Sequence, residues 1–128
     1  MKCISLFESL TRASVKDCID TPSGLIFIVE PSEIGKAIGK GGANVRKIEG
    51  LLKHKIKVVA FDQQKAQFLR NFLYPIVNFD ILEEADILKI KCGDLKTRGQ
   101  IIGRNATALR LSEDILRRYF TLEKIVVV

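Results

Sequence analysis

Apolar residues recur along the chain with two different periods, and the changes of period predict short helices and strands. Leu25–Val29 is an unbroken apolar run with the length of a buried strand. A later segment carries Val45, Ile48, Leu51 and Leu52 at helical spacing, which predicts an amphipathic helix from Ala43 to Lys53 with these residues on one face. In order, the first half is expected to form a helix over 4–10, strands over 14–20 and 25–29, helices from 31 and from 43, and a strand over 56–61.

The same order of elements returns after Asp62. The second half is expected to form a helix over 63–74, strands over 76–82 and 87–92 around an acidic turn, helices over 96–102 and 107–119, and a strand over 123–128. Residues 64 positions apart match in type: Gly35 with Gly99, Ile38 with Ile102, Gly39 with Gly103, Lys40 with Arg104, Val45 with Leu109, and Arg46 with Arg110. This repeat covers a whole strand–helix–turn–helix–strand unit, so it predicts two domains, 1–62 and 63–128, joined rigidly through the helix over 63–74.

The stretch Ile38-Gly39-Lys40-Gly41-Gly42 lies between two predicted helices. A glycine turn that opens a helix can present backbone N–H groups to an anion at the positive end of the helix dipole. Lys40 adds a mobile positive charge at the same place. A phosphate-contacting turn and a plain connecting turn, in which glycine only supplies positive φ, are both compatible with these five residues.

The location of the net charge of +6 favours a turn that contacts phosphate. Seven lysines and arginines lie between Gly35 and Lys57 against the single acid Glu49, so this window carries a charge equal to that of the whole chain. An excess of positive charge around the glycine turn indicates a polyanionic partner, nucleic acid above all. A solvated helix face is the other explanation that a charge run allows.

Composition narrows the class of protein. A hydrophobic fraction of 47% is enough for a packed core, and no apolar run approaches the roughly 18 residues of a membrane span. With no signal-peptide pattern at the N-terminus, we expect a cytoplasmic protein without a membrane partner. The three cysteines are far apart, and the chain has one histidine, so a four-ligand zinc site and a disulfide framework are not expected.

Enzyme classes find little support in the chain. Gly35 to Lys40 approximates the phosphate loop GxxxxGK of nucleotide hydrolases, but its glycines are one residue too close. Gly41 also stands where that loop needs a hydroxyl for magnesium. No Ser/His/Asp or Cys/His set suggests itself, and we expect neither catalysis nor a cofactor.

A turn of the form Ile-Gly-x-x-Gly between two helices, after a strand, resembles the KH domain. The resemblance implies binding of single-stranded RNA, with the sugar-phosphate backbone on the turn and the bases on an apolar groove between the two helices and the strand over 56–61. The residues expected to contact RNA in the first half are Lys36, Ile38, Gly39, Lys40, Gly41, Gly42, Asn44, Arg46, Lys47 and Lys57.

The order α-β-β-α-α-β in each half corresponds to the type II form of this domain. The resemblance therefore implies an α+β fold of two tandem type II KH domains, each with a three-stranded mixed sheet packed by helices. Two such domains in a short chain are similar to the archaeal NusA-like transcription factors. That similarity implies a role in elongation, termination or antitermination, with RNA polymerase or the elongation complex as a further partner. A structural KH protein of the ribosome and a protein-interaction module with a vestigial motif are the alternatives.

The second half departs from the motif, because alanine replaces its last glycine. The residues expected to contact RNA there are Gly103, Arg104, Asn105, Ala106 and Arg110. The methyl group of Ala106 stands where the RNA backbone would approach closely. We therefore expect the first turn to contribute more to binding than the second, although both could belong to one RNA surface.

Overall fold

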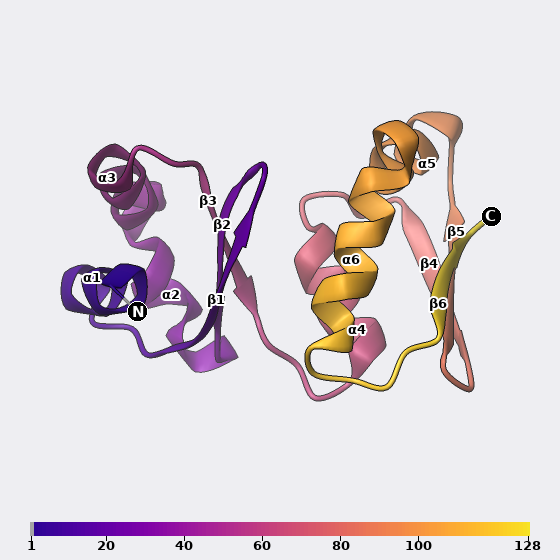
Figure 1. The fold of residues 1–128 in the computed structure, drawn as a ribbon, viewed down its shortest axis with the longest axis horizontal. Helices are drawn as coiled ribbons and strands as arrows, with labels where there is room; N and C mark the ends of the chain where they lie inside the picture. Colours follow the sequence, from indigo (N-terminus) through magenta and orange to yellow (C-terminus); the bar gives the residue numbers. More distant parts are fainter. Residues whose placement is uncertain (1) are drawn as a thin grey trace. The chain divides into compact units, whose positions relative to one another are not determined.

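The computed structural model describes residues 2–128, which divide after Asp62 into two compact units, the second of them Gln63–Val128. Both units have the element order α-β-β-α-α-β (Figure 1). The first consists of α1 (Lys2–Thr11), β1 (Val15–Thr21), β2 (Gly24–Val29), α2 (Ile34–Ile38), α3 (Ala43–Leu52) and β3 (Ile56–Ala60). The second consists of α4 (Lys65–Leu73), β4 (Phe79–Glu84), β5 (Ile87–Cys92), α5 (Leu95–Ile102), α6 (Thr107–Arg117) and β6 (Lys124–Val127).

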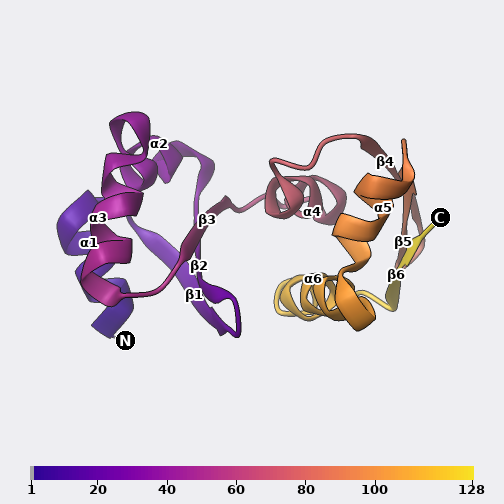
Figure 2. The same ribbon diagram turned by 90° about the horizontal axis from the view of Figure 1, so that it is seen from above.

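Each unit contains one mixed sheet of three strands. In the first, β2 is central, antiparallel to β1 and parallel to β3. In the second, β5 takes the central place between antiparallel β4 and parallel β6. The helices of the first unit lie on one face of its sheet (Figures 1 and 2). Both halves therefore have the expected α+β architecture with a three-stranded mixed sheet.

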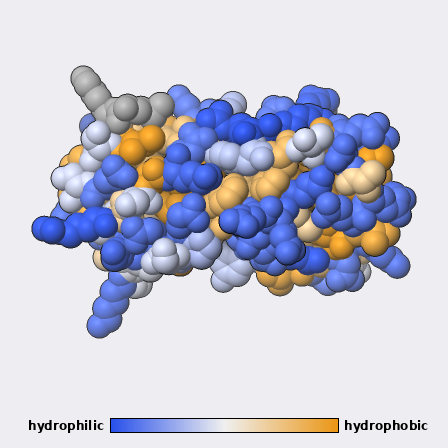
Figure 3. Space-filling model, turned by 90° about the horizontal axis from the view of Figure 1, so that it is seen from below, coloured by the Kyte–Doolittle hydropathy of each residue, from blue (hydrophilic) through white to orange (hydrophobic). Residues whose placement is uncertain are grey.

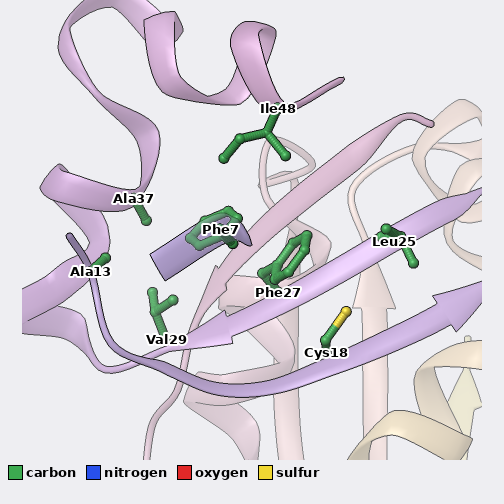
Figure 4. Close-up of a cluster of buried hydrophobic side chains, with 8 residues drawn as sticks. All are labelled: Phe7, Ala13, Cys18, Leu25, Phe27, Val29, Ala37 and Ile48. Atoms are coloured by element: carbon green, nitrogen blue, oxygen red, sulfur yellow. The ribbon is translucent and has the colours of Figure 1, made fainter. Parts of the chain in front are cut away.

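The core of the first unit lies between this sheet and its helices. The rings of Phe7 on α1 and Phe27 on β2 stack with their centroids 4.2 Å apart, and both side chains are fully buried. The other members of the cluster come from the loop after α1, both paired strands and the helices α2 and α3 (Figure 4): Ala13, Cys18, Leu25, Val29, Ala37 and Ile48. Burial of this much apolar area fixes α2 and α3 against the sheet, and so fixes the ends of the turn between them.

The core of the second unit is built in the same way around Phe68 of α4. Its ring lies 5.6 Å from that of Tyr119 and 5.9 Å from that of Phe120, which follow α6. The fully buried aliphatic side chains beside these aromatic residues come from α4, β5, α5 and α6: Leu69, Leu88, Ile90, Ile101, Ile115 and Leu116.

One carboxylate in each unit fastens the third helix to the last strand. Glu49 on α3 accepts a hydrogen bond from the N–H of Ile56 at 3.0 Å, where β3 begins. Glu113, 64 positions later on α6, accepts from the N–H of Ile125 in β6 at 2.9 Å. The single acid in the basic window of the first half therefore has a structural partner.

The strand expected over 76–82 is wrong in its bounds. β4 begins at Phe79 and runs to Glu84, whose Cα pairs with that of Ile87. The acidic residues expected to form a turn therefore belong partly to the strand, and the turn itself is Ala85-Asp86, with φ of 53° at Ala85. An edge strand tolerates exposed carboxylates, so polarity alone does not locate the end of this one.

Hydrophilic side chains dominate the face drawn in Figure 3. Among residues 2–128, no helix is long and apolar enough to span a membrane.

Candidate nucleic-acid interface

The first glycine turn reverses the chain between α2 and α3 through three residues with positive φ. Gly39 ends α2 with φ 76° and ψ 168°. One turn of 3-10 helix follows over Lys40–Gly42, in which Gly41 has φ 62° and Gly42 has φ 78°. The N–H of Gly42 donates to the carbonyl oxygen of Gly39 at 3.1 Å and closes the turn. Side chains with a Cβ rarely adopt these angles, so this path favours glycine at all three positions, most strictly at Gly39 with its ψ of 168°.

The tip of the turn offers unsatisfied donors in an exposed position. Within the part of the chain that the structure describes, no carbonyl oxygen accepts from the backbone N–H of Lys40 or Gly41. Both residues are exposed, and they precede the N-terminus of the ten-residue helix α3. Free N–H groups, a helix N-terminus and the Lys40 ammonium therefore coincide, which is the arrangement that binds anions such as phosphate.

The second turn follows the same backbone path. Gly103 has φ 74° and ψ 175°, close to the values of Gly39. Asn105 and Ala106 have φ of 55° and 60°, and their ψ of 32° and 23° are close to those of Gly41 and Gly42. The replacement of two glycines by residues with side chains has not changed the course of the chain.

A model of the KH domain matches residues 3–68, slightly more than half of the chain. The chain belongs to the KH-domain family. The matched region contains the first turn, the two helices α2 and α3 that flank it, and all three strands of the first unit.

Two relatives resemble the chain over most of its length. It is 28% identical to the "Probable transcription termination protein NusA" of Methanocaldococcus jannaschii, covering 98% of this chain and 70% of that one. It is 29% identical to the protein of the same name from Halococcus morrhuae, covering 98% and 91%. The crystal structure of APE1850 matches with a TM-score of 0.76 at 28% identity, covering 99% of this chain and 96% of that one. The resemblance of this KH protein to archaeal NusA-like proteins is thus confirmed.

The cations of the first KH turn differ in how free they are. Lys40 and Lys47 are exposed, and no ion pair involving either is found in the described residues. Lys36 is also exposed, but its ammonium lies 3.4 Å from the carboxylate of Glu33. A hydrogen bond from the backbone N–H of Ser14, aided by Lys36, lowers the pKa of Glu33 and keeps this partner ionised. Lys40 and Lys47 are therefore freer than Lys36 to meet an anion.

The side chain of Lys57 does not lie beside the turn. Its neighbours Ile56 and Val58 pack against the core cluster under the helices, so the alternation of a strand directs Lys57 to the opposite face of the sheet. Burial lowers the pKa of its ammonium. The sequence placed Lys57 in the basic window by position alone, and the pleat of β3 separates it from the other lysines.

The side chain of Ile38 projects partly into solvent next to the turn, with 36% of its surface exposed. Leu51, which was expected on the apolar face of its helix, is instead 56% exposed near the end of α3. Both helices also carry residues that face inward, such as Ala37 and Ile48, which are fully buried. Apolar surface is therefore available on α2 and α3 outside the core, although the groove expected to hold bases stays a prediction.

The turn of the second unit carries its own cations. Arg104 and Arg110 are exposed, and Lys96 and Arg98 on α5 are exposed as well. Thr107 was not among the expected site residues, yet its hydroxyl donates to the carbonyl oxygen of Arg104 at 2.7 Å and braces the turn. A threonine at the first position of a predicted helix is the signal that could have indicated this contact.

Other kinds of site find no support near the turns. Within the described residues, no group of three or more His, Cys, Asp and Glu side chains could hold a metal ion. A cavity of about 430 Å³ lies at the start of α4, where Lys65 bonds to the carbonyl oxygen of Thr121 at 2.9 Å and pairs with Asp86 at 3.4 Å. Lys65 is thus neutralised by its own unit, and the cavity contains no residue of either turn.

Proposed function

We propose that this protein is a NusA-like transcription factor that binds single-stranded RNA and acts in transcription elongation, termination or antitermination. Its two units would be tandem type II KH domains, residues 1–62 with an intact GxxG turn and residues 63–128 with a GxxA turn. RNA polymerase or the elongation complex would be its partner, in the cytoplasm and without catalysis. The relatives named as NusA proteins support the role in transcription.

One observation carries the proposed RNA contact. The N–H groups of Lys40 and Gly41 have no acceptor within the described chain, in a turn whose three glycines leave its backbone uncovered. Phosphates can approach such a backbone closely, and Lys40 adds a charge at the same tip. Single strands fit this arrangement because their bases remain free to meet the apolar surface of the helices.

The direct test replaces the tip residues by acids. Lys40→Asp with Gly41→Asp places two carboxylates beside the phosphate position. Neither side chain should disturb the fold, since a Cβ at Gly41 meets no atom within 4 Å and aspartate, like Asn105 at the equivalent position, tolerates the left-handed φ. We expect loss of binding to single-stranded RNA in a filter-binding titration, with only a small change in Tm. Unchanged affinity would show that RNA binds elsewhere, and unfolding would show that the turn is structural.

Two charge-matched controls sharpen this experiment. Arg104→Asp with Asn105→Asp makes the same change of charge in the second turn and measures its share of the binding. Ser23→Asp with Lys124→Asp makes the same change at two exposed residues outside both turns, and should weaken binding only slightly. Equal losses in all three variants would indicate a general charge effect rather than contact at the turns.

Salt dependence tests whether phosphates lead the binding. A site that contacts three or four phosphates on a single strand gives a slope of log affinity against log salt of roughly −2 to −3. Duplex RNA and ATP serve as competitors, and we expect neither to displace the single strand efficiently. A slope near zero would exclude phosphate-led binding.

The role in transcription needs a separate assay. Transcription in vitro by an archaeal RNA polymerase, with and without the protein, should show a changed fraction of terminated transcripts. The Lys40→Asp, Gly41→Asp variant should lose this effect. A protein that binds RNA but leaves termination unchanged would favour the ribosomal alternative, which a pull-down of ribosomal RNA would then test.

A further inference from the structure

Two side chains at the start of α3 reach back onto the first turn. The amide Nδ2 of Asn44 donates to the carbonyl oxygen of Lys36 at 2.8 Å. The guanidinium Nη1 of Arg46 donates to the carbonyl oxygen of Gly41 at 2.6 Å. One bond therefore ties α3 to the last turn of α2, and the other holds the tip of the loop between them.

Asn44 also packs directly on the first glycine. A Cβ added at Gly39 would lie 2.8 Å from Cγ and 2.9 Å from Nδ2 of Asn44. The carbonyl of Lys36 is one of those at the C-terminal end of α2, which have no partner inside the helix. Asn44 satisfies this carbonyl and closes the inner side of the turn in a single contact.

The second turn lacks both contacts. Ala108 stands 64 positions after Asn44 and has no side-chain donor, and no carbonyl oxygen of the turn accepts from Arg110 within residues 2–128. The hydroxyl of Thr107 makes the bond to Arg104 instead. The same backbone path is thus held in two different ways.

The difference follows the glycine content of the turns. The first contains Gly39, Gly41 and Gly42, and glycine has the most backbone freedom to lose when a chain is ordered. The second has only Gly103, since Asn105 and Ala106 restrict the chain by themselves. The turn with more freedom is the one that carries the two side-chain contacts.

We propose that Asn44 and Arg46 are positioning residues that hold the first turn in its phosphate-accepting conformation before RNA arrives. The inference rests on the proposed RNA binding and changes the role of both residues, which the sequence suggests as direct contacts. A loop that is already ordered avoids most of the entropy loss on binding. Removing the Asn44 contact should therefore weaken binding about three- to tenfold, which is the range that ordering costs of this kind produce.

The test measures backbone order in the free protein and RNA affinity separately. Asn44→Ala copies Ala108 into the first unit. We expect lower NMR order parameters for the N–H groups of Lys40, Gly41 and Gly42 without RNA, weaker binding of single-stranded RNA, and an unchanged salt slope, because no charge is removed. Arg46→Lys keeps the charge while removing the planar fork, and should change both readings in the same direction.

Ala108→Asn is the matched variant in the second unit. An amide at this position can reach the carbonyl of Gln100, which corresponds to Lys36, and should raise the order parameters of Arg104 to Ala106. This arm keeps the inference testable if Asn44→Ala fails to fold.

Each outcome has a defined meaning. Weaker RNA binding by Asn44→Ala with unchanged order in the free protein would make Asn44 a direct contact and overturn the inference. Unchanged affinity, whatever the order parameters show, would overturn it as well. If the unmodified protein binds no RNA at all, the proposed function fails, whereas the order parameters of the free variants still report whether Asn44 holds the turn.

Discussion

Gly42 and Ala106 occupy the same left-handed position at the ends of the two turns, with φ of 78° and 60° and ψ of 16° and 23°. An alanine in this region costs about 1 kcal/mol relative to glycine, which a folded unit can absorb. Alanine in place of the last glycine therefore leaves the backbone path of the second turn unchanged and adds a methyl group to it.

This equivalence predicts the effect of exchanging the two residues. Gly42→Ala should fold with a loss of about 1 kcal/mol, because its Cβ would stand at positive φ and 3.3 Å from Nη1 of Arg46, which must shift slightly. Its methyl group should also weaken binding of single-stranded RNA. Ala106→Gly should strengthen binding or leave it unchanged. Urea denaturation and RNA titration of the two variants provide the measurements.

The ranking of the two turns depends on the same pair of variants. The RNA used must be long enough to reach both units. A silent Gly42→Ala together with a severe Arg104→Ala would make the second turn the main site, contrary to our expectation.

The first glycine of each turn is under a stricter requirement than the last. Gly39 and Gly103 have ψ of 168° and 175° at positive φ, a region that essentially only glycine populates. Their added Cβ atoms would also meet backbone nitrogens, that of Asn44 at 2.9 Å and that of Ala108 at 2.8 Å. This explains in physical terms why the repeat keeps glycine at its first position and not at its last.

We therefore predict a graded response among the glycines of the first turn. Gly39→Ala should destabilise the first unit by about 2 kcal/mol or more, since it combines backbone strain with a clash against backbone. Gly41→Asn should be almost neutral, because Asn105 adopts the equivalent conformation and a Cβ at Gly41 meets open space. Thermal denaturation gives the comparison, with Gly103→Ala as the parallel variant. Equal effects at the two positions of the first turn would contradict the geometry.

Much of this arrangement could be predicted from the sequence, because the repeat at a spacing of 64 relates residues of the same type. It predicted both turns, the order of the elements and most strands, including β5 with its bounds of Ile87–Cys92. It could not predict that Ala106 would follow the path of a glycine. That outcome depends on whether the folded unit can absorb the cost of about 1 kcal/mol for alanine at positive φ, which residue type does not tell. Lys57 was grouped with the turn because charge counting ignores the alternation of a strand.

The sequence also could not predict the contacts of Asn44, Arg46 and Glu49. Their residue types are compatible with contact to RNA or solvent, and only the folded geometry shows that each bonds to the backbone of its own unit. Side-chain-to-backbone contacts across a turn depend on distances that sequence spacing does not give.

Glu49 and Glu113 predict a matched effect on stability. Glu49→Ala leaves the N–H of Ile56 without its carboxylate, and Glu113→Ala does the same to Ile125, so each should destabilise its unit by about 1–2 kcal/mol. Glu49→Gln keeps an acceptor oxygen and should recover most of the loss. Amide hydrogen exchange at Ile56 and Ile125 locates each effect, and a loss of protection in the wrong unit would contradict it.

The thiol of Cys18 gives a prediction for pH. Burial, aided by the nearby Cys3, Asp17 and Asp20, raises the pKa of Cys18 to about 11. In the unfolded chain the same thiol ionises near its ordinary value, so as pH rises the unfolded state loses this proton first. The contribution of the thiol to stability is therefore fully present below about pH 8.5 and is lost as pH rises toward 11. Urea midpoints of the unmodified protein should fall between pH 8.5 and 10.5 by more than those of Cys18→Ala.

Alkylation checks the same residue without unfolding the protein. At pH 8 the buried, protonated Cys18 should react with iodoacetamide more slowly than the half-buried Cys3, because the thiolate is the nucleophile. In urea the difference should disappear, which controls for the intrinsic reactivity of the three thiols. Mass spectrometry of the labelled peptides reads each site. If Cys18 reacts as fast as Cys3 in the folded protein, then the edge strand β1 opens readily, and Cys18 does not stay packed in the core in solution.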